Sequence, residues 1–277
     1  MTAAQVDVPL SIDTVREARR AARLGGAIHY FESVDSTNSV AHRLAGECAA
    51  EGTVVIAETQ TRGRGRLGRR WISPPLRNLY MSVVLRPPLP AAAAPQLSLV
   101  AGLAAAETIR EWAPRACLKW PNDVLINGRK VCGILTEMEA EGGRVAFVIL
   151  GIGVNLNSTD DEFPAELQGK AVSVRSTTGA IVDRTAFTER LLSRLEERYD
   201  LFLREGFAAI QPLWEAFSSL TGRHVRIDDG GTHYEGCVAG IADDGSLRVR
   251  DATGRALQVM VGDVTVVDGY ATDHGKE

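Results

Sequence analysis

The sequence predicts an α+β fold in which a large domain of mixed strands and helices precedes a small β-barrel. Up to residue 220, stretches with helical and with strand periodicity follow one another along the chain. From Gly222 onward, short alternating strands are separated by Asp-Asp-Gly-Gly, Asp-Asp-Gly and Ala-Thr-Gly turns, a spacing typical of a closed barrel of about fifty residues. We therefore expect an N-terminal tail and helix at 1–26, a large domain at 27–220 and a barrel at 221–270.

The composition favours a soluble globular protein with a substantial core. The 277 residues are 45% hydrophobic and 24% charged, and the formal net charge of -4 argues against a general nucleic-acid binder. We expect a cytoplasmic protein without membrane contact, because there is neither an apolar stretch of roughly eighteen residues nor a signal-peptide pattern. The four cysteines are scattered without C-x-x-C spacing, which indicates neither a disulfide framework nor a zinc site.

The first part of the large domain is expected to contain two helices separated by a strand. Ser11 to Leu24 predicts an amphipathic helix that ends at Gly25-Gly26, and a strand follows at 28–34. Asp35-Ser36-Thr37-Asn38 is a dense helix-start signal for a helix that runs to about Cys48. Capping needs only one of these four polar residues, so the surplus at a positive helix end leaves room for ligand binding.

Five arginines and three glycines are concentrated in the segment 60–71, which reads Gln-Thr-Arg-Gly-Arg-Gly-Arg-Leu-Gly-Arg-Arg-Trp. Glycine lets backbone N–H groups approach a ligand closely, and arginine supplies a permanent charge on a planar fork that matches phosphate or carboxylate. The segment therefore predicts an anion clamp, with a solvated basic loop as the alternative. Its glycines also spell G-x-G-x-x-G, but Trp71-Ile72-Ser73-Pro74-Pro75 cannot open the helix that a dinucleotide-binding turn requires.

Further elements follow from periodicity and turn residues. Asn127-Gly128 is a hairpin signal, and Pro121 should interrupt the strand Leu118 to Val124 or confine it to a sheet edge. The other expected elements are strands at 53–57, 78–85, 130–139 and 144–150 and helices at 96–112, 184–205 and 210–220. Lysines are scarce: only Lys119, Lys130, Lys170 and Lys276 occur among 31 basic residues, so a lysine can mark a place that needs a compact ammonium group.

Five stretches, taken in order, resemble the biotin protein ligase family. They are Ser36-Thr37-Asn38, Gln60 to Trp71, Lys119-Trp120-Pro121-Asn122-Asp123, Gly128-Arg129-Lys130-Val131-Cys132-Gly133 and Gly151-Ile152-Gly153-Val154-Asn155. The arginine–glycine loop and the Lys-Trp-Pro-Asn-Asp stretch are close to diagnostic in combination. The resemblance implies the class II synthetase-like catalytic fold of biotin and lipoate ligases, a central mixed β-sheet with flanking helices, followed by an SH3-like barrel.

The resemblance also implies an ATP-dependent reaction in two steps. Biotin and Mg-ATP would give biotinyl-5′-AMP and pyrophosphate, and the biotinyl group would pass to one lysine of the biotin carboxyl carrier domain of an acetyl-CoA or related acyl-CoA carboxylase. The residues suit this chemistry, because joining a carboxylate to an α-phosphate brings two anions together and needs concentrated positive charge. No covalent enzyme intermediate is required, in keeping with the lack of a convincing nucleophile–base pair.

The resemblance assigns roles to individual residues of this sequence. Arg66 and Lys130 would be catalytic, and Asp123 is a candidate ligand of Mg²⁺. The biotin-binding residues would be Ser36, Thr37, Asn38, Gln60, Arg64, Gly65, Arg66, Lys130 and Gly133. The nucleotide-binding residues would be Arg66, Arg69, Trp71, Lys119, Asn122 and Asn155. Arg62 and Arg70 are expected to be bystanders.

The sequence departs from the bifunctional branch of that family, which carries an N-terminal winged helix-turn-helix. Only about 27 residues precede the first core strand, and the single helix they can form does not make such a module. We therefore expect a monofunctional ligase that does not bind DNA and is a monomer or a weak, ligand-dependent homodimer. The arginine–glycine loop should become ordered on ligand binding and close the site, because it buries little and its arginines repel one another.

Two other functions are weighed against this one. A lipoate ligase or octanoyltransferase would share the catalytic fold but would lack the arginine–glycine loop. Such a transferase would use a nucleophilic cysteine or lysine, and Cys132 beside Lys130 would have to serve, although free cysteine is usually a buried apolar residue. A non-catalytic Arg/Gly RNA-binding protein would interleave aromatic residues with its arginines, whereas only Trp71 lies near them.

Overall fold

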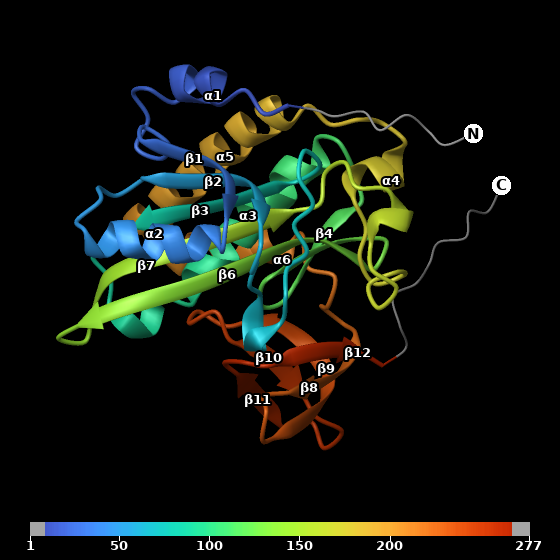
Figure 1. The fold of residues 1–277 in the computed structure, drawn as a ribbon. Coiled ribbons are helices and arrows are strands. Elements are labelled where there is room, and N and C mark those ends of the chain that lie inside the picture. The colour runs from blue at the N-terminus through green and yellow to red at the C-terminus, as the bar shows by residue number, and fades with distance from the viewer. Residues whose placement is uncertain (1–8, 268–277) are drawn as a thin grey trace.

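A seven-stranded mixed sheet forms the centre of the large domain in the computed structural model, which describes residues 9–267 (Figure 1). Its strands are β1 (Ile28–Val34), β2 (Val54–Gln60), β3 (Leu79–Leu85), β4 (Ala116–Lys119), β5 (Asp123–Ile126), β6 (Arg129–Glu141) and β7 (Arg144–Val154). They lie in the order β1-β2-β3-β7-β6-β5-β4; β1 and β2 are parallel, and the other neighbours are antiparallel. Residues 1–8 of the expected tail and 268–270 of the expected barrel lie outside the described residues.

Helices cover both faces of this sheet (Figure 1). They are α1 (Ile12–Ala18), α2 (Thr37–Gly46), α3 (Gln96–Arg110), α4 (Val174–Thr178), α5 (Arg184–Glu205) and α6 (Phe207–Glu215). Because successive strand residues point to opposite faces, Val54 and Ile56 of β2 join the core that includes α3 and α5, whereas Val55 packs with Val40 and Ala41 of α2. With both faces covered, β3 is buried along its whole length.

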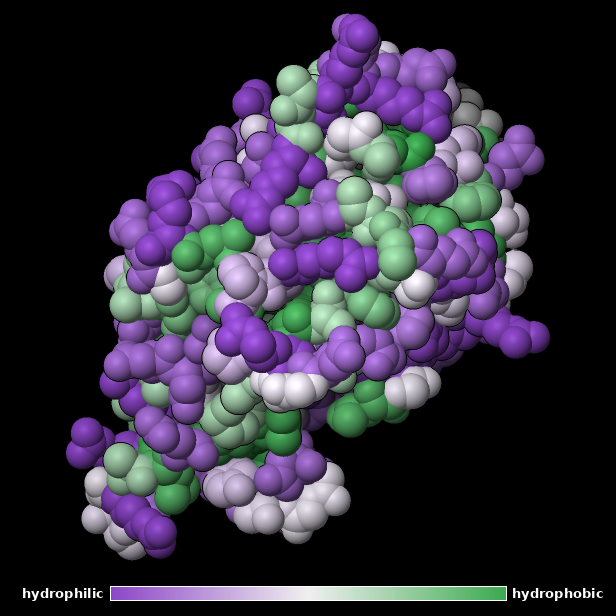
Figure 2. Space-filling model, turned by 90° about the vertical axis from the view of Figure 1, so that its left-hand side faces the viewer, coloured by the Kyte–Doolittle hydropathy of each residue, from purple (hydrophilic) through white to green (hydrophobic). Residues whose placement is uncertain are grey.

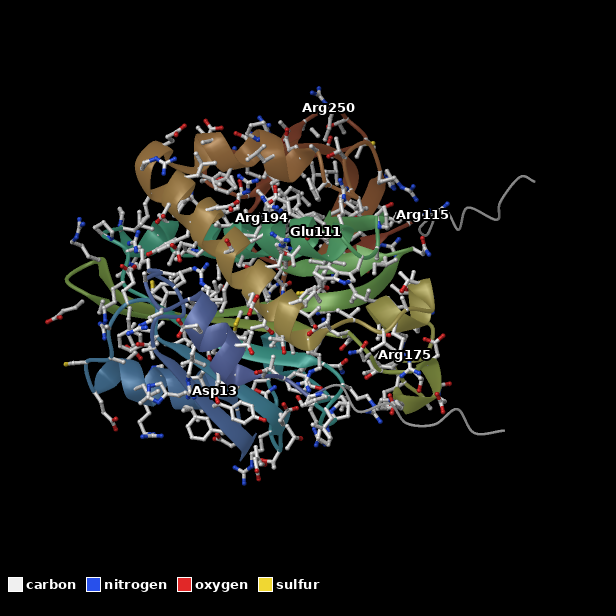
Figure 3. The ribbon with its side chains drawn as sticks, turned by 90° about the horizontal axis from the view of Figure 1, so that it is seen from above. Asp13, Glu111, Arg115, Arg175, Arg194 and Arg250 are labelled. Atoms are coloured by element: carbon white, nitrogen blue, oxygen red, sulfur yellow. The ribbon has the colours of Figure 1, made fainter. Side chains whose placement is uncertain are left out.

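The longest apolar segment belongs to the core of this domain. Within residues 9–267, one segment, Ala91–Arg110, has the length and composition of a membrane span, but 67% of it is buried inside the protein. Its C-terminal end packs against α5 through ion pairs as well as apolar contacts (Figure 3). Arg198 lies 2.7 Å from Glu107, and Arg194 lies 3.6 Å from Glu111. These contacts are those of a core helix in a globular domain.

A second, antiparallel sheet of five strands follows the large domain. Its strands are β8 (His224–Asp228), β9 (His233–Ile241), β10 (Leu247–Arg250), β11 (Ala256–Val259) and β12 (Asp263–Val266). They lie in the order β11-β10-β9-β8-β12. This arrangement is consistent with the expected small SH3-like domain, but β11 and β12 are edge strands that do not pair with each other within the described residues. The expected hydrogen-bonded closure of the barrel is therefore not seen.

The five-stranded sheet contacts the large domain through the turn before β10. Trp120 is 1% exposed, and its indole Nε1 donates to the carbonyl of Gly245 over 3.0 Å. Gln96 Nε2 donates to the Asp243 carbonyl over 3.3 Å, and Glu215 accepts from the Ile241 amide over 3.0 Å. A single turn of the small domain thus contacts both the N-terminus of α3 and the segment between β4 and β5.

Several expected elements differ in the structure. The helix expected over 210–220 is α6 at Phe207–Glu215, and two other differences have a clear physical reason. The helix expected over 11–24 ends at Ala18. Arg19 supplies the reason, because its guanidinium donates to the Leu24 carbonyl over 3.0 Å and pairs with Glu196 of α5, which also accepts from the Leu24 amide. These tertiary bonds satisfy the backbone in a turn and replace the continued helix.

The second difference concerns the segment Leu118 to Val124, expected as one interrupted strand. The chain instead forms the antiparallel hairpin β4–β5, with Leu118 opposite Val124 and the Trp120-Pro121-Asn122 segment at its turn. The Asn-Gly hairpin is as expected, since Asn127 and Gly128 join β5 to β6 with φ of 50° and 74°. The strand expected to end at residue 150 continues to Val154 in β7.

Candidate active site

Two adjoining cavities lie where the arginine–glycine loop crosses the central sheet. The narrower has a volume of ≈ 40 Å³ and the wider one of ≈ 360 Å³. The residues expected to bind biotin all line the narrow cavity, and those expected to bind the nucleotide, together with Asp123, all line the wide cavity. Both cavities are lined by Gly65, Arg66, Trp71, Asn122 and Lys130. The two sets of residues therefore meet at a shared junction.

The N-terminus of α2 forms one wall of the narrow cavity. Gln60 Oε1 accepts from the Thr37 amide over 2.9 Å, so a side chain of β2 caps the helix from outside. Ser36, at the N-cap position, makes no side-chain capping bond, although it is only 3% exposed. A buried hydroxyl that capping does not use, set at the positive end of a helix, is available to a polar ligand.

Asn38 lies deeper in the same wall and is held on three sides. Ser82 Oγ of β3 lies 2.6 Å from Asn38 Oδ1, and the Asn38 amide nitrogen donates to Glu137 over 2.7 Å and to the Leu135 carbonyl over 3.3 Å. A β-carbon at Gly151 would come within 2.1 Å of Asn38 Oδ1, so this place in β7 requires glycine. The Gly-Ile-Gly stretch thus admits the side chain of Asn38 and is not itself shown to bind a ligand.

Trp71 forms the partition between the two cavities. Its ring lies against Gly133 of β6 and Gly153 of β7, which face each other in the sheet. A β-carbon would meet the ring at 3.0 Å from Gly133 and at 2.5 Å from Gly153. The indole Nε1 is buried and has no hydrogen-bond partner within the described residues. A buried donor without a partner, placed between two cavities, can be satisfied by an acceptor on a bound ligand.

Lys130 places a positive charge at the junction. Its Nζ lies 2.6 Å from Asp123 Oδ1 and 5.5 Å from the centre of the Trp71 ring. The amide of Lys130 donates to the Lys170 carbonyl over 2.8 Å, so the backbone that presents the side chain is fixed by the loop before α4. Asp123, the residue that the sequence suggested as a metal ligand, thus forms an ion pair with Lys130 in this structure. Within residues 9–267, no group of three or more His, Cys, Asp or Glu side chains could hold a metal ion.

Arg66 is oriented by the turn between β4 and β5. Its Nη1 donates to Asn122 Oδ1 over 3.0 Å, and Asn122 Nδ2 donates to the Ile134 carbonyl over 2.8 Å. Burial lowers the pKa of Arg66, while the nearby Asp263 and Asp123 act in the opposite direction. A guanidinium keeps its charge even so, and a partly buried charge interacts more strongly with an anion than an exposed one. In this structure Asn122 thus orients the guanidinium of Arg66.

The wide cavity has walls from both domains. Burial lowers the pKa of Lys119, and Asp123 opposes this effect. Arg69 forms an ion pair with Asp263 of β12, and Asp263, Val264 and Thr265 line the cavity beside it. The side-chain amide of Asn155 donates to the Val172 carbonyl over 3.2 Å. Asn155 therefore lines the cavity while its amide supports the neighbouring loop.

The arginine–glycine loop is a short hairpin and does not open a helix beyond a single 3-10 turn at Arg66–Gly68. The Gly65 amide donates to the Arg69 carbonyl over 2.7 Å, and the Trp71 amide donates to the Gly63 carbonyl over 2.9 Å. The chain then continues into β3, which confirms that the G-x-G-x-x-G spacing is not a dinucleotide-binding turn. Its tip residue, Leu67, is 73% exposed with φ of 56°.

Several residues of the site were not expected from the sequence. Ser82 and Glu137 contact Asn38 from neighbouring strands, and Asp263 reaches the wide cavity from the second domain. Lys170 also lines that cavity. Three of the four lysines thus lie around one cavity, so the scarcity of lysine in the sequence was a signal that could have indicated Lys170. Nothing in the local sequence marks Ser82, Glu137 and Asp263, because their partners are distant in the chain.

Cys132 is not placed to act as a nucleophile. It is fully buried beneath the sheet, and this burial raises the pKa of its thiol far above the usual range. A thiol that stays protonated and is closed off from the cavities cannot attack a bound acyl group. This finding agrees with its expected role as a small apolar residue.

Comparison with known sequences supports the interpretation of the fold and the cavities. Residues 30–155 match the biotin/lipoate A/B protein ligase family. The bifunctional ligase/repressor BirA of Bacillus subtilis (strain 168) is 41% identical over 240 residues, which cover 86% of this chain and 74% of that protein. The biotin–[acetyl-CoA-carboxylase] ligase of Paracoccus denitrificans is 39% identical over 230 residues, covering 80% and 94% respectively.

A solved structure shows the same architecture. The biotin protein ligase from Aquifex aeolicus in complex with biotin and ATP matches with a TM-score of 0.73 at 30% identity, over 86% of this chain and 97% of that one. The fold and its two joined cavities therefore define a ligase of the biotin and lipoate class. Because relatives above 30% identity are covered over more than two thirds of their length, the chain belongs to the biotin protein ligase family. It is a biotin ligase enzyme.

Proposed function

We propose that the protein activates biotin with ATP to form biotinyl-5′-AMP and transfers the biotinyl group to a lysine of a biotin carboxyl carrier domain of an acetyl-CoA or related carboxylase. One observation carries the proposal: a narrow cavity with a polar wall at the start of α2 and a wide cavity meet at Arg66, Trp71 and Lys130. An elongated acid and a nucleotide bound in these two cavities would present their reacting ends to the same two positive charges.

In the first step, an oxygen of the biotin carboxylate attacks the α-phosphorus of ATP and pyrophosphate leaves. The ureido head of biotin would lie at the start of α2, and the carboxylate would lie near Lys130. Arg66 and Lys130 stabilise the negative charge that accumulates on the five-coordinate phosphorus, where a well-placed donor contributes roughly 3–4 kcal/mol by analogy with oxyanion-hole groups. The buried Nε1 of Trp71 supplies one more donor at this junction.

In the second step, the amine of the carrier lysine attacks the acyl carbonyl, an amide bond forms and AMP leaves. Arg64, Gly65 and Arg66 form the part of the loop that would cover the mixed anhydride and keep water away from it. When bound, Mg²⁺ would neutralise charge on the phosphate oxygens. Asp123 would be its protein ligand, since Mg²⁺ in nucleotide sites often takes only one or two carboxylates and completes its shell with phosphate and water.

The test is biotin-dependent exchange of pyrophosphate into ATP, followed by transfer to an isolated carrier domain. We expect exchange with biotin, none with lipoate or octanoate, and labelling of the carrier that is lost when its acceptor lysine is changed to arginine. Exchange that depends on lipoate would assign the protein to lipoate ligases. The expected cytoplasmic location and the monomer or weak homodimer stay predictions, which fractionation and sedimentation with and without biotin can check.

A further inference from the structure

Glu137 of β6 joins the two parts of the narrow cavity that are farthest apart in sequence. One oxygen, Oε2, accepts from Asn38 Nδ2 over 2.7 Å and from Arg64 Nη2 over 2.8 Å. Asn38 belongs to the wall at the start of α2, and Arg64 belongs to the arginine–glycine loop. Within the described residues, two ion pairs join an arginine of the loop to another element. One is Arg64 with Glu137 and the other is Arg69 with Asp263.

The carboxylate decides which end of the Asn38 amide a ligand can use. An ionised carboxylate only accepts hydrogen bonds, so the amide must turn its NH₂ group toward Glu137. Both N–H groups are then taken, one by Glu137 and one by the Leu135 carbonyl. Oδ1 keeps one acceptor position besides its contact with Ser82. Asn38 is therefore fixed as an acceptor toward the cavity, which matches a ligand that presents N–H groups, as a cyclic urea does.

The same oxygen holds the loop across the cavity. Arg64 comes at the start of the loop hairpin, and its backbone pairs with Arg70. The loop has little apolar anchorage, because Leu67 at its tip is 73% exposed. The contact between Arg64 and Glu137 spans from the loop to β6, next to the head-group wall. Losing it would free the loop and the Asn38 amide together.

We propose that Glu137 is a positioning residue for biotin, which fixes Asn38 as a hydrogen-bond acceptor and holds Arg64 over the cavity. This inference rests on the proposed function, since it names the group that orients the biotin-binding wall. Glu137 itself is not required to touch the ligand. Its effect should fall on biotin and not on ATP, because the wide cavity lies on the other side of Trp71.

The test compares Glu137→Gln with Glu139→Gln. Both residues lie on the same face of β6 two positions apart, and Glu139 contacts only the exposed His42, over 3.1 Å. We expect Glu137→Gln to raise the biotin KM in pyrophosphate exchange, and the biotin Kd in calorimetry, by about tenfold, the effect of one lost charge-assisted hydrogen bond. The ATP KM should change less than about twofold, and Glu139→Gln should match the wild type in both.

A second arm tests the loop. Trypsin should cleave Glu137→Gln faster than Glu139→Gln within residues 62–70. Introduced into the Arg64→Ala variant, Glu137→Gln should raise the biotin Kd by a smaller factor than it does in the wild type. The reason is that the contact between Arg64 and Glu137 is already absent in Arg64→Ala. Additive effects of the two substitutions on the biotin Kd, or equal rates of trypsin cleavage in the two variants, would overturn the proposal that Glu137 holds the loop through Arg64. Should Glu137→Gln unfold, Arg64→Ala alone must raise the biotin Kd while leaving the ATP KM unchanged.

The outcomes separate this inference from the proposed function. If the wild type lacks biotin-dependent exchange, the proposed function fails. If the wild type is active and Glu137→Gln behaves like Glu139→Gln, only the role of Glu137 is wrong. If Glu137→Gln raised the ATP KM as much as the biotin KM, the positioning role of Glu137 would also be overturned. Equal effects would indicate a general distortion of the sheet, which affects both cavities.

Discussion

Trp71 can divide the site because two strands offer its ring a surface without side chains. Gly133 and Gly153 stand opposite each other in β6 and β7, and neither has the positive φ that would explain glycine by backbone conformation. The close approach of the ring explains both glycines. The stretch Gly151-Ile152-Gly153 was one of the five that carry the family resemblance, and the structure gives its glycines the role of admitting the side chains of Asn38 and Trp71.

Gly153→Ala should therefore impair the enzyme without any direct contact to a ligand. The added methyl group would lie 2.5 Å from the Trp71 ring, so the ring must move from the junction of the cavities. We expect a loss of about 1–3 kcal/mol in the free energy of unfolding from overpacking, together with a higher KM for both biotin and ATP. Gly46→Ala is the matched control, because nothing lies within 4 Å of its new methyl group. Equal KM values in the two variants would contradict this role of Gly153.

Two arginines of the loop should differ sharply in function. Arg66 is half-buried at the junction and donates to Asn122, whereas Arg70 is exposed. Arg66→Ala should lower the rate of adenylate formation by about 10²–10³-fold, or release the adenylate into solution, because one donor to the reacting phosphate is lost. Arg70→Ala should leave the rate nearly unchanged. Pyrophosphate exchange and adenylate release measure both, and a comparable loss in Arg70→Ala would show that the loop charge acts as a whole.

The sequence was sufficient to predict which side chains meet at the site, because contiguous stretches carry them and the resemblance assigns them. It could not predict their partners. Asn122 and Asn155 line the wide cavity, and the amide nitrogen of each also donates to a protein carbonyl that the sequence did not indicate. Glu137 was not expected at all, since its importance comes from Asn38 and Arg64, which are brought to it only by the folded sheet.

Among the structural elements, those with strong local signals were predicted well. The Asn127-Gly128 hairpin follows its turn residues, and the helix expected at 184–205 has these bounds in α5. The segment 11–24 and the stretch around Pro121 were predicted less well. In both segments, contacts between residues distant in the chain determine the local conformation. Arg19 and Glu196 end α1, and Trp120 donates a hydrogen bond to Gly245 of the second domain. Periodicity contains no information about such partners.

Trp120→Phe tests how the second domain supports the turn between β4 and β5. Phenylalanine keeps most of the buried ring but removes the N–H group, which leaves the Gly245 carbonyl without its donor. We expect a loss of about 1–3 kcal/mol in the free energy of unfolding. The ATP KM should rise more than the biotin KM, because the turn carries Lys119, Asn122 and Asp123 into the wide cavity. An unchanged ATP KM would mean that the turn holds its shape without the second domain.

Over residues 9–267, a separate small sheet after the central one was predictable, while its contribution to a cavity shared with the large domain was not. The change of pattern near Gly222 marks a separate small sheet, and the structure agrees. The strand β12 nevertheless brings Asp263 to Arg69, so residues almost two hundred positions apart form one wall. The small domain therefore forms part of the wall of the wide cavity, the proposed nucleotide site, and its sequence alone could not indicate this.

A buried ion pair connects the catalytic sheet, the loop before β3 and the start of α5. Glu58 of β2 lies 2.8 Å from Arg184, accepts from Tyr30 over 3.0 Å and accepts from the Leu76 amide over 3.1 Å. The side chains of Arg184 and Glu58 are only 1% and 7% exposed. Removing one partner of a buried pair leaves the other charge without compensation.

Glu58→Ala should lower the free energy of unfolding by about 3–5 kcal/mol, measured by urea denaturation. Glu197→Ala, which removes an exposed partner of Arg194 on α5, should cost less than about 1 kcal/mol. Neither Glu58 nor Glu197 lines a cavity described above, so the KM values of the folded fraction should not change. A change in the biotin KM of Glu58→Ala would contradict this, and would show that the buried pair also sets the position of Gln60, two residues further along β2.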